Sequence, residues 1–551
     1  MASAMIKDAL NIVYTYLSQK FAKKDLTKLC GALNKITEVT GHDYKKVNEL
    51  ITCSYEDVQD ILSSINEKES IRKTKGVYYT PFDVVEFMLC NSIKASVNEL
   101  KSATLHLLDL NGVPYKEICV EKNIFDPTCG TGVFLLAALN IKFDLLDTNI
   151  KNVTNLMVKN VIATIHGNDV NPESIAITKI RLYLATLYRY GISKTAGIEE
   201  ILNCSFSSYD FVQKSVNRKE KYDIVIGNPP YVEDTKSGLD PVKKYGNIYA
   251  NVLKNSAEML LDGGVFAFII PLSYISTPRM QAIRDDLFEL VPEQYIMSYS
   301  DRPDCLFASV HQKLCILLAA KKHCPRKIYT SSYQYWYKEN RDNLFLSTKV
   351  VKNEFVRSKY IPKLGNEKDV SIYKKILALN KNPSLYDMNK VGDGHLFLNM
   401  RATFWVKAFL REHRGSEYRD CQYQSADDAN YAMCLYNSSL FWWYWVCVSD
   451  CWHITKKELV GFHVPVIRNY EIVNQLAWLL ENQLENTKEY VGTKQIEYEY
   501  KHKKCIDVIH KVDDFINNLF DLTNAESEYI KNFAYRFRVG GGAEVAKRKS
   551  D

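Results

Sequence analysis

Short apolar runs alternate with helix-spaced segments between about residues 76 and 325 of the chain. The clearest of these runs read NIFDP, VIATIHGND, KYDIVIGNPP, GGVFAFIIP and KLCILLAA. Alternation of strands and helices over such a length is typical of a doubly wound α/β sheet. In such a sheet, ligands bind at the carboxyl ends of the strands, near the point where the strand order reverses.

The two flanks of this region have different patterns. Residues 1–70 contain no proline and show helical spacing at Val58 and Leu62. From about residue 330 the alternation gives way to aromatic, charged and irregular stretches, and helical spacing returns near the C-terminus. We therefore predict an N-terminal helical segment over 1–70, a Rossmann-like α/β domain over 71–330 and a mixed α+β domain over 331–551.

The composition narrows the function classes only slightly. The chain has 551 residues and a net charge of +6, from 71 basic and 65 acidic residues. This excess is compatible with a nucleic-acid partner but too small to require one. The 14 cysteines show no CxxC spacing, which favours reduced thiols in a cytosolic protein over a disulfide framework or a zinc site. We predict no metal site.

We also predict a soluble, intracellular protein without a membrane segment. The N-terminus has no basic leader followed by an apolar core. The longest aromatic and apolar run, LFWWYWVCV at 440–448, has about half the length that spans a bilayer. This run is more typical of the core of a helix than of a DNA-contacting surface.

The first motif with chemical content reads FDPTCGTG, over residues 125–132. An apolar run ends in Asp126, and a turn with Gly130 and Gly132 leads into the apolar stretch VFLLAALNI. Because glycine has no Cβ, backbone N–H groups can approach a ligand closely there. Many glycine turns are purely structural, but an acid, a proline and two glycines this close together favour a ligand-binding loop.

Two further acids follow at or near predicted strand ends. Asp169 lies in GNDVNP, where a carboxylate is suited to accept hydrogen bonds from ribose hydroxyl groups. Asn171 can cap the following helix, which leaves Asp169 available for a ligand. In SYDF, Asp210 could accept a hydrogen bond from an adenine amino group while Phe211 covers the ring. For these last two residues the pattern alone leaves a structural role equally open.

The motif GNPPY, over residues 227–231, follows the run KYDIVI. Two prolines end a strand, and they also remove two backbone donors and fix the loop. The groups that remain are acceptors, namely the Asn228 side-chain oxygen and the Pro229 carbonyl. Two adjacent acceptors suit an exocyclic amino group, which has two hydrogens to donate. Tyr231 offers a flat face on which a base can stack.

In this order, the motifs resemble those of S-adenosylmethionine-dependent DNA adenine-N6 methyltransferases of the gamma class, and most closely the Eco57I-like restriction–modification branch. The resemblance covers residues 71–325, from GVYYTP (Gly76 to Pro81) to CLFASVHQKLCILLA (Cys305 to Ala319). It implies S-adenosylmethionine as the cofactor and a target adenine that is flipped out of double-stranded DNA. A looser likeness to the target recognition region of this family extends into the C-terminal part.

The resemblance also implies roles for individual residues. Thr80 and Pro81 would lie near the methionine moiety, Asp169 would hold the ribose, and Asp210 would hold the adenine. The implied cofactor-binding residues are Tyr79, Thr80, Pro81, Asp126, Pro127, Cys129, Gly130, Gly132, Asp169, Val170, Asp210, Phe211 and Asn228. The implied catalytic residues are Asn228, Pro229, Pro230 and Tyr231, with Tyr231 and Phe307 stacking on the target base.

Other functions remain open at the level of sequence. The same acceptor pair occurs in enzymes that methylate cytosine N4, adenine in RNA or a glutamine of release factors, although the last group lacks a long C-terminal extension. A modification subunit of a multisubunit restriction enzyme is a further alternative. A fused nuclease is disfavoured because Asp304 is not followed by an ExK pattern, and a non-catalytic remnant is disfavoured because every motif is intact.

We predict partners and a location on the same basis. The expected partner is double-stranded DNA, read by a monomer in the bacterial cytoplasm, in association with the nucleoid. A cognate restriction endonuclease is a candidate second partner, and an orphan enzyme is the alternative. The C-terminal residues that we favour for DNA contact are Arg401, Arg411, Arg414, His453, Lys456 and Lys457.

Overall fold

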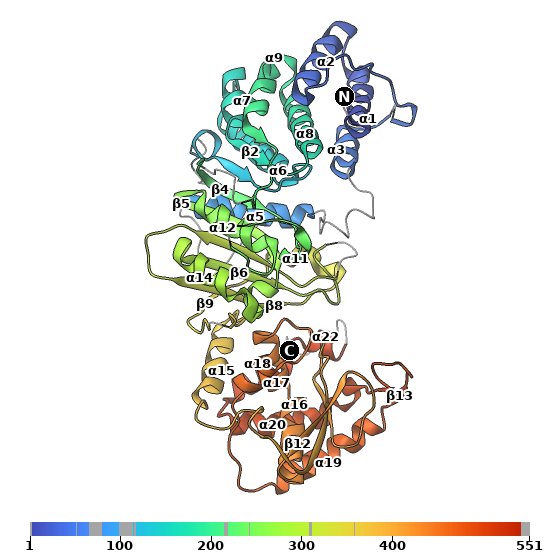
Figure 1. Ribbon diagram of the computed structural model, residues 1–551, viewed down its shortest axis with the longest axis vertical. Helices are drawn as coiled ribbons and strands as arrows, with labels where there is room; N and C mark the ends of the chain where they lie inside the picture. Colours follow the sequence, from blue (N-terminus) through green and yellow to red (C-terminus); the bar gives the residue numbers. More distant parts are fainter. Residues whose placement is uncertain are drawn as a thin grey trace, which may run out of the picture.

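The computed structural model shows an elongated molecule with three parts in the order of the sequence (Figure 1). Helices of the N-terminus lie at one end, a large sheet with its helices occupies the middle, and the C-terminal part lies at the other end. The structure describes residues 3–50, 52–65, 80–97, 114, 117–213, 219–241, 243–307, 311–357 and 359–540.

A nine-stranded sheet in the order β3-β2-β1-β4-β5-β7-β6-β8-β9 forms the middle of the molecule. Its strands are β1 (Ile124–Asp126), β2 (Ile165–Asn168), β3 (Phe206–Ser207), β4 (Tyr222–Gly227), β5 (Leu260–Pro271), β6 (Glu293–Tyr299), β7 (Leu314–Ala320), β8 (Lys327–Gln334) and β9 (Val351–Lys352). Strands β1 to β5 are parallel, and β7 runs antiparallel to both β5 and β6. The predicted Rossmann-like, doubly wound sheet is therefore confirmed.

Side chains of successive residues in these strands enter two different cores, because they alternate between the faces of the sheet. On β4, Ile224 and Ile226 belong to one core and Val225 to the other. The first core continues into the N-terminal helices. The second continues into the C-terminal part of the chain, so that part shares its hydrophobic core with one face of the sheet.

Helices cover both faces of the sheet, as expected for alternating strands and helices. They are α5 (Phe82–Ser96), α6 (Val133–Asn149), α7 (Asn155–Ile162), α8 (Pro172–Tyr190), α9 (Ile192–Thr195), α10 (Ile198–Ser205), α11 (Asp234–Ser237), α12 (Ile248–Glu258), α13 (Ser273–Ser276) and α14 (Gln281–Leu290). The predicted cap of α8 is confirmed, since the Asn171 side-chain oxygen accepts a hydrogen bond from the Glu173 N–H.

The N-terminal segment is helical, as the spacing predicts. Its helices are α1 (Ala4–Lys20), α2 (Lys23–Thr37) and α3 (Tyr55–Ser64). Ser54 and Asp57 form a capping box at the start of α3, in which each side chain accepts the other residue's N–H. Gln59 on α3 exchanges hydrogen bonds with Arg181 on α8, which joins this segment to the sheet region.

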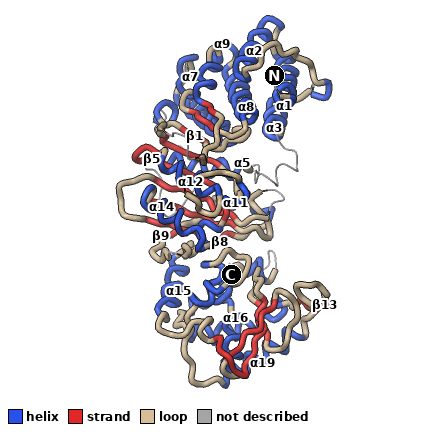
Figure 2. Tube along the Cα trace, in the orientation of Figure 1, coloured by secondary structure: helices blue, strands red, loops and turns tan. Residues whose placement is uncertain are grey.

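The C-terminal part combines a small antiparallel sheet with helices (Figure 2). Its elements are α15 (Glu367–Ala378), β10 (Asn389–Asn399), β11 (Lys407–Phe409), β12 (Tyr418–Tyr423), α16 (Ala426–Asn437), α17 (Ser439–Val448), α18 (Lys456–Gly461), α19 (Glu471–Glu485), β13 (Glu489–Tyr490), β14 (Tyr498–Glu499), α20 (Ile506–Leu519), α21 (Asn524–Asn532) and α22 (Tyr535–Arg538). This mixed composition agrees with the predicted α+β class.

The aromatic run at 440–448 forms α17, and every residue of this helix is buried. The indole N–H groups of Trp442, Trp443 and Trp445 donate to the Thr403 carbonyl, the Asp369 carboxylate and the His453 carbonyl, respectively. Buried indole groups need such acceptors. The interpretation of this run as helix core rather than DNA surface is confirmed.

The large sheet extends beyond residue 330, where we predicted the α/β domain to end. Strand β8 spans that position, and β9 follows about twenty residues later in the same sheet. The alternation of strands and helices fades there because β7, and no helix among the described residues, lies between the parallel neighbours β6 and β8 in the sequence. The domain boundaries themselves stay predictions.

No helix among the residues that the structure describes is long and apolar enough to cross a membrane.

The buried His502 predicts a pH dependence of stability. Its Nε2 lies 3.2 Å from the Asn437 side-chain oxygen, and burial lowers the pKa of the imidazole to about 3. Between these two pKa values the imidazole is protonated in the unfolded chain, where its pKa is about 6.5, and neutral in the folded chain. The free energy of unfolding therefore falls as the pH drops from about 6.5 toward 3. In His502→Gln we expect this loss to be smaller by about 2 kcal/mol between pH 6.5 and 5, since one proton contributes about 1.4 kcal/mol per pH unit.

The free energy of urea unfolding at the two pH values measures this difference. His323→Gln is the matched control, since the His323 side chain is exposed, and it should keep the pH dependence of the wild type. The same pH dependence in His502→Gln and in the wild type would contradict the prediction.

Candidate active site at the carboxyl edge of the sheet

The loop after β1 is built around Asp126. Its carboxylate is buried and accepts a hydrogen bond from the Thr128 N–H at 3.0 Å. Burial raises the pKa of Asp126 well above its usual range, and the nearby Asp169 adds to this. A Cβ at Gly227, on the neighbouring β4, would lie 2.7 Å from the Asp126 Oδ1. The glycine of GNPPY therefore makes room for the acid of the first motif.

The two glycines of this loop have different functions. Both have positive φ, +53° at Gly130 and +81° at Gly132. A Cβ at Gly132 would collide with Thr178 of α8 at 2.5 Å, so this glycine allows α6 and α8 to pack closely. A Cβ at Gly130 would meet nothing within 4 Å. The space where a Gly130 side chain would lie is therefore open, as a loop that contacts a ligand requires.

The carboxylate of Asp169 lies at the end of β2 and binds the first loop directly. Its Oδ2 accepts from the Gly130 N–H at 2.9 Å, and its Oδ1 accepts from the Asn171 N–H at 2.8 Å. The next side chain, Val170, is 67% exposed. The structure thus brings Asp169, Val170 and Gly130 together at the open side of the loop.

Asn168 connects three strand-end loops and was not singled out from the sequence. Its Nδ2 donates to the Pro127 and Tyr209 carbonyls, both at 3.0 Å, and its Oδ1 accepts from the Tyr209 N–H. The Asn168 carbonyl accepts from the Cys129 N–H. The one signal in the sequence is its place beside Asp169 in GNDVNP. Asn168 therefore positions the loops after β1, β2 and β3.

Asp210 and Phe211 lie in the loop after β3, with unequal exposure. The Asp210 Oδ1 accepts from the Val212 N–H at 3.1 Å, and the side chain is partly exposed. Phe211 is only 3% exposed and packs against Phe125 and Tyr209. Its ring faces the protein core, so the apolar surface that is open at this edge comes from Val170 instead.

The side chains of GNPPY form a connected group at the end of β4. The Asn228 Nδ2 donates to the Thr80 Oγ1 at 3.1 Å, and the Tyr231 hydroxyl lies 2.7 Å from the Asn228 Oδ1. That hydroxyl is also 2.8 Å from the Ile269 carbonyl of β5. These contacts orient the amide, with its nitrogen toward Thr80 and its oxygen toward Tyr231.

The Pro229 carbonyl belongs to the next residue of the chain. None of the residues that the structure describes donates a hydrogen bond to it. Pro229 itself is buried, whereas Pro230 is partly exposed. The use of these two groups as a pair of acceptors stays a prediction.

Thr80 and Pro81 are the last two residues of the motif GVYYTP and directly precede α5. Thr80 is buried, and Pro81 is the N-cap residue of α5. Through its hydrogen bond with Asn228, Thr80 brings two motifs together that lie 148 residues apart in the sequence. Tyr79 and the other residues of GVYYTP before Thr80 lie outside the described residues.

Phe307 is 1% exposed and belongs to the hydrophobic core shared with the N-terminal helices. The structure therefore gives its ring no open face. The segment before it is held by Arg341, whose guanidinium donates to the Cys305 and Leu306 carbonyls and to the Asp83 carboxylate of α5 at 2.7 Å. Sequence reasoning missed Arg341, which has no motif around it.

The C-terminal candidates for DNA contact are scattered. Lys457 is turned inward, since its ammonium donates to the Ser276 and Val448 carbonyls. Arg411 donates to the Asn482 side chain, and Arg401 stacks on Trp452. The remaining candidates Arg414, His453 and Lys456 contact Glu412, Glu417 and the Tyr386 ring, respectively.

Within the described residues, no group of three or more His, Cys, Asp or Glu side chains is arranged to hold a metal ion. The strand order and the loops at the carboxyl edge instead define a Rossmann-like methyltransferase fold.

Comparison with known proteins agrees with this class. Residues 163–301 match the family model described as Eco57I restriction-modification methylase. This part of the chain is thus similar to Eco57I-like restriction–modification methylases, and the resemblance seen in the motifs is confirmed.

Two curated relatives share part of the chain. The type II methyltransferase M.BstVI of Geobacillus stearothermophilus is 28% identical over 177 residues, which are 30% of this chain and 31% of that protein. The adenine-specific methyltransferase PglX of Streptomyces coelicolor is 25% identical over 218 residues, 33% of this chain and 16% of that protein. The chain thus spans less than a third of the length of either relative.

Among solved structures, the type IIL restriction-modification enzyme MmeI in complex with DNA aligns over 94% of this chain and 84% of that chain, with 11% identity and a TM-score of 0.49.

Proposed function

We propose that the chain transfers a methyl group from S-adenosylmethionine to the N6 amino group of an adenine in double-stranded DNA. The observation that carries this proposal is the loop after β4, in which Thr80 and Tyr231 orient the Asn228 amide and the Pro229 carbonyl follows as the next residue. An amide oxygen and a backbone carbonyl together accept both hydrogens of one amino group.

These two acceptors act on the nucleophile. The lone pair of adenine N6 is conjugated with the ring, so the nitrogen is a weak nucleophile in the ground state. Acceptors on both of its hydrogens favour the tetrahedral nitrogen and the positive charge that develop during attack. After the nitrogen–carbon bond has formed, the extra proton leaves to solvent. Tyr231, fixed by its hydroxyl, offers its ring as a stacking partner for the base.

The residues at the carboxyl edge fit S-adenosylmethionine. The open backbone at Gly130, the carboxylate of Asp169 and the exposed Val170 lie side by side, and they suit a loop contact, a ribose and the face of an adenine. When bound, the cofactor supplies a methyl group already activated as a sulfonium. The contribution of the chain is to align that group with the amino nitrogen in the GNPPY loop.

The DNA must present the base to this loop outside the duplex. An amino group stacked inside a duplex cannot reach two acceptors in a loop, so the nucleotide has to be flipped out. We assign residues 331–551 to target recognition, residues 71–330 to catalysis and residues 1–70 to support of the catalytic part. We further propose that the enzyme acts as a monomer in the bacterial cytoplasm, with or without a cognate restriction endonuclease.

Methylation of cytosine N4 has equal chemical support, since N4 is also an exocyclic amino group bonded to an aromatic ring. An RNA adenine and a modification subunit that needs partner chains are further alternatives. The adenine-specific relative and the motif order favour adenine in DNA.

Product analysis tests the proposal. The protein is incubated with cofactor carrying a labelled methyl group and with genomic DNA from cells that lack the gene, and the DNA is digested to nucleosides. We expect label in N6-methyladenine. Label in N4-methylcytosine would show that cytosine is the target base, and label in RNA only would show that RNA is the substrate. No label in any nucleic acid would overturn the proposal.

A further inference from the structure

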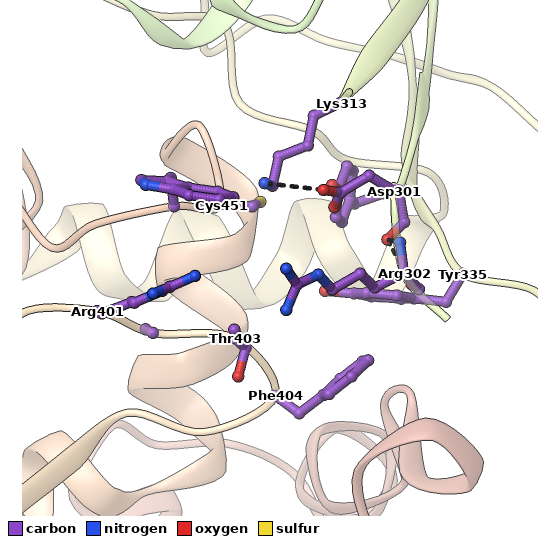
Figure 3. Close-up of a pocket in the computed structure, with 12 residues that line it drawn as sticks. Asp301, Arg302, Lys313, Tyr335, Arg401, Thr403, Phe404 and Cys451 are labelled. Atoms are coloured by element: carbon purple, nitrogen blue, oxygen red, sulfur yellow. Dashed lines mark hydrogen bonds and ion pairs between the residues drawn. The ribbon is translucent and has the colours of Figure 1, made fainter. Parts of the chain in front are cut away.

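A cleft lies between the large sheet and the C-terminal part, at the same edge as the candidate active site (Figure 3). The loops after β6, β8 and β10, the residue before β7 and the residues after α17 contribute to it. Its lining residues are Ser300, Asp301, Arg302, Lys313, Tyr333, Tyr335, Arg401, Ala402, Thr403, Phe404, Cys451 and Trp452.

The lining of this cleft carries excess positive charge. Three cations, Arg302, Lys313 and Arg401, stand against one carboxylate, Asp301, which leaves two positive charges in excess. The Asp301 carboxylate is buried and pairs with Lys313 at 3.4 Å. The side chains of Arg302 and Arg401 form no ion pair with any carboxylate that the structure describes.

The two unpaired arginines point toward each other across the cleft, from loops that lie about a hundred residues apart in the sequence. Like charges that face each other without a carboxylate repel, and an anion between them removes that repulsion. Guanidinium groups bind phosphate through parallel N–H donors, so two of them suit one phosphodiester.

Trp452 holds two of these cations in place. Its ring centroid lies 4.2 Å from the Lys313 ammonium and 5.1 Å from the Arg401 guanidinium carbon, and its side chain is 39% exposed. Cation–π contacts fix the position of the cations without neutralising their charge. Two acids lie near this residue: Asp450 accepts from the Trp452 N–H, and Glu417 lies 3.9 Å from His453.

The cleft is connected to the GNPPY loop through β5. The Tyr231 hydroxyl lies 2.8 Å from the Ile269 carbonyl, and the Leu272 N–H, just after β5, donates to the Lys313 carbonyl at 2.9 Å. From β4 to β7 and β6 there are two to three strand spacings, which is about 10–15 Å. A DNA strand carries one phosphate per about 3.4 Å of helix axis, so the cleft lies within a few nucleotides of the GNPPY loop.

We propose that Arg302 and Arg401 bind a phosphodiester group of the DNA strand, a few nucleotides from the target base. This assignment rests on the proposed function, because it presumes DNA as the substrate. Lys313 and Trp452 are positioning residues that hold Arg401 and the cleft wall in place. The contact is to the backbone, so it contributes affinity and register and reads no sequence.

Salt-dependent DNA binding by the full chain tests this assignment. The dissociation constant of a labelled duplex is measured over a series of salt concentrations for the wild type, Arg302→Gln, Arg401→Gln and Arg401→Lys. One phosphate contact contributes about 0.9 to the slope of log K against log salt, equal to about eightfold in affinity at 0.1 M salt relative to 1 M. We expect the slope of each glutamine variant to be smaller than that of the wild type by this contribution, and its affinity to fall by the same factor on every duplex. Arg401→Lys should keep the slope of the wild type.

Arg326→Gln is the matched control, since this exposed arginine precedes β8, lies outside the cleft and stands over the Phe288 ring; its slope should equal that of the wild type. Slopes unchanged in both cleft variants would overturn the assignment, as would an equal loss in the Arg326 variant or a wild type that binds no duplex. A wild type that binds duplex but methylates nothing would overturn the proposed function alone, and the slopes would still decide on the cleft.

Discussion

Methyl transfer by Asn228→Ala is expected to be about a thousandfold slower than by the wild type. This factor is about 4 kcal/mol of transition-state free energy, the size of effect seen when one oriented hydrogen-bond partner of a developing charge is removed. The substitution deletes the amide oxygen that we propose as an acceptor for the amino group. It also leaves the Thr80 hydroxyl and the Tyr231 hydroxyl without their contacts to this side chain.

The rate of a single turnover on duplex DNA measures this loss, and the affinities for cofactor and duplex are measured separately. We expect both affinities to stay within a few-fold of the wild type, because the acceptor acts mainly in the transition state. Asn149→Ala is the matched control, since Asn149 is exposed at the end of α6 and bonds only the Leu145 carbonyl. A wild-type rate in Asn228→Ala would disprove the assigned mechanism.

Tyr231→Phe separates the ring from the hydroxyl within the same experiment. The ring that stacks on the base remains, but the contacts of the hydroxyl with Asn228 and the Ile269 carbonyl are lost. We expect a decrease of about fivefold, since one neutral hydrogen bond contributes about 1 kcal/mol and the amide keeps its bond to Thr80. A loss as large as that of Asn228→Ala would assign the hydroxyl itself to the chemistry.

The second large effect is expected from Asp169→Ala, as a rise of about a hundredfold in the dissociation constant of S-adenosylmethionine. The carboxylate would no longer accept from a ribose hydroxyl, and the N–H groups of Gly130 and Asn171 would lose their acceptor. Hydrogen bonds to a charged group contribute about 1.5–3 kcal/mol, so the loss of one ligand contact and of the loop geometry together gives this factor.

Calorimetric titration with the cofactor measures the affinity, and hydrogen exchange at residues 128–132 measures the loop directly. We expect faster exchange at the Gly130 N–H in Asp169→Ala even without cofactor, because the hydrogen bond at 2.9 Å is gone. Asp144→Ala, on the exposed face of α6 where Asp144 pairs with Arg189, is the control. Unchanged cofactor affinity together with faster exchange would show a purely structural role for Asp169.

The candidate site could be predicted from the sequence where its chemistry is local. The acceptors of GNPPY are consecutive residues, and the contact between Asp169 and Gly130 follows once both loops lie at the ends of adjacent parallel strands. The strand β6 escaped prediction because Glu293, Gln294 and Ser298 interrupt its apolar pattern. These polar residues are buried in the fold, where Gln294, for example, accepts from the Tyr274 hydroxyl.

The aromatic residues show a different limit of prediction. The motifs assign Phe211 and Phe307 to open ligand faces, but the structure buries both rings. Exposure depends on which elements pack over a residue, and the segments that cover these two positions come from other parts of the chain. Conversely, the exposure of Val170 could not be read from its apolar character, which by itself favours burial.

The sequence by itself determined the doubly wound sheet, the helical N-terminal segment, the buried aromatic helix and the order of the methyltransferase motifs, because each of these follows from short-range periodicity or from consecutive residues. The tertiary structure alone decided the long-range contacts. Asn168 joins three loops, Arg341 bonds both α5 and the segment before Phe307, and Arg302 and Arg401 line one cleft. Such contacts depend on how distant segments pack together, and a local pattern carries no record of that packing.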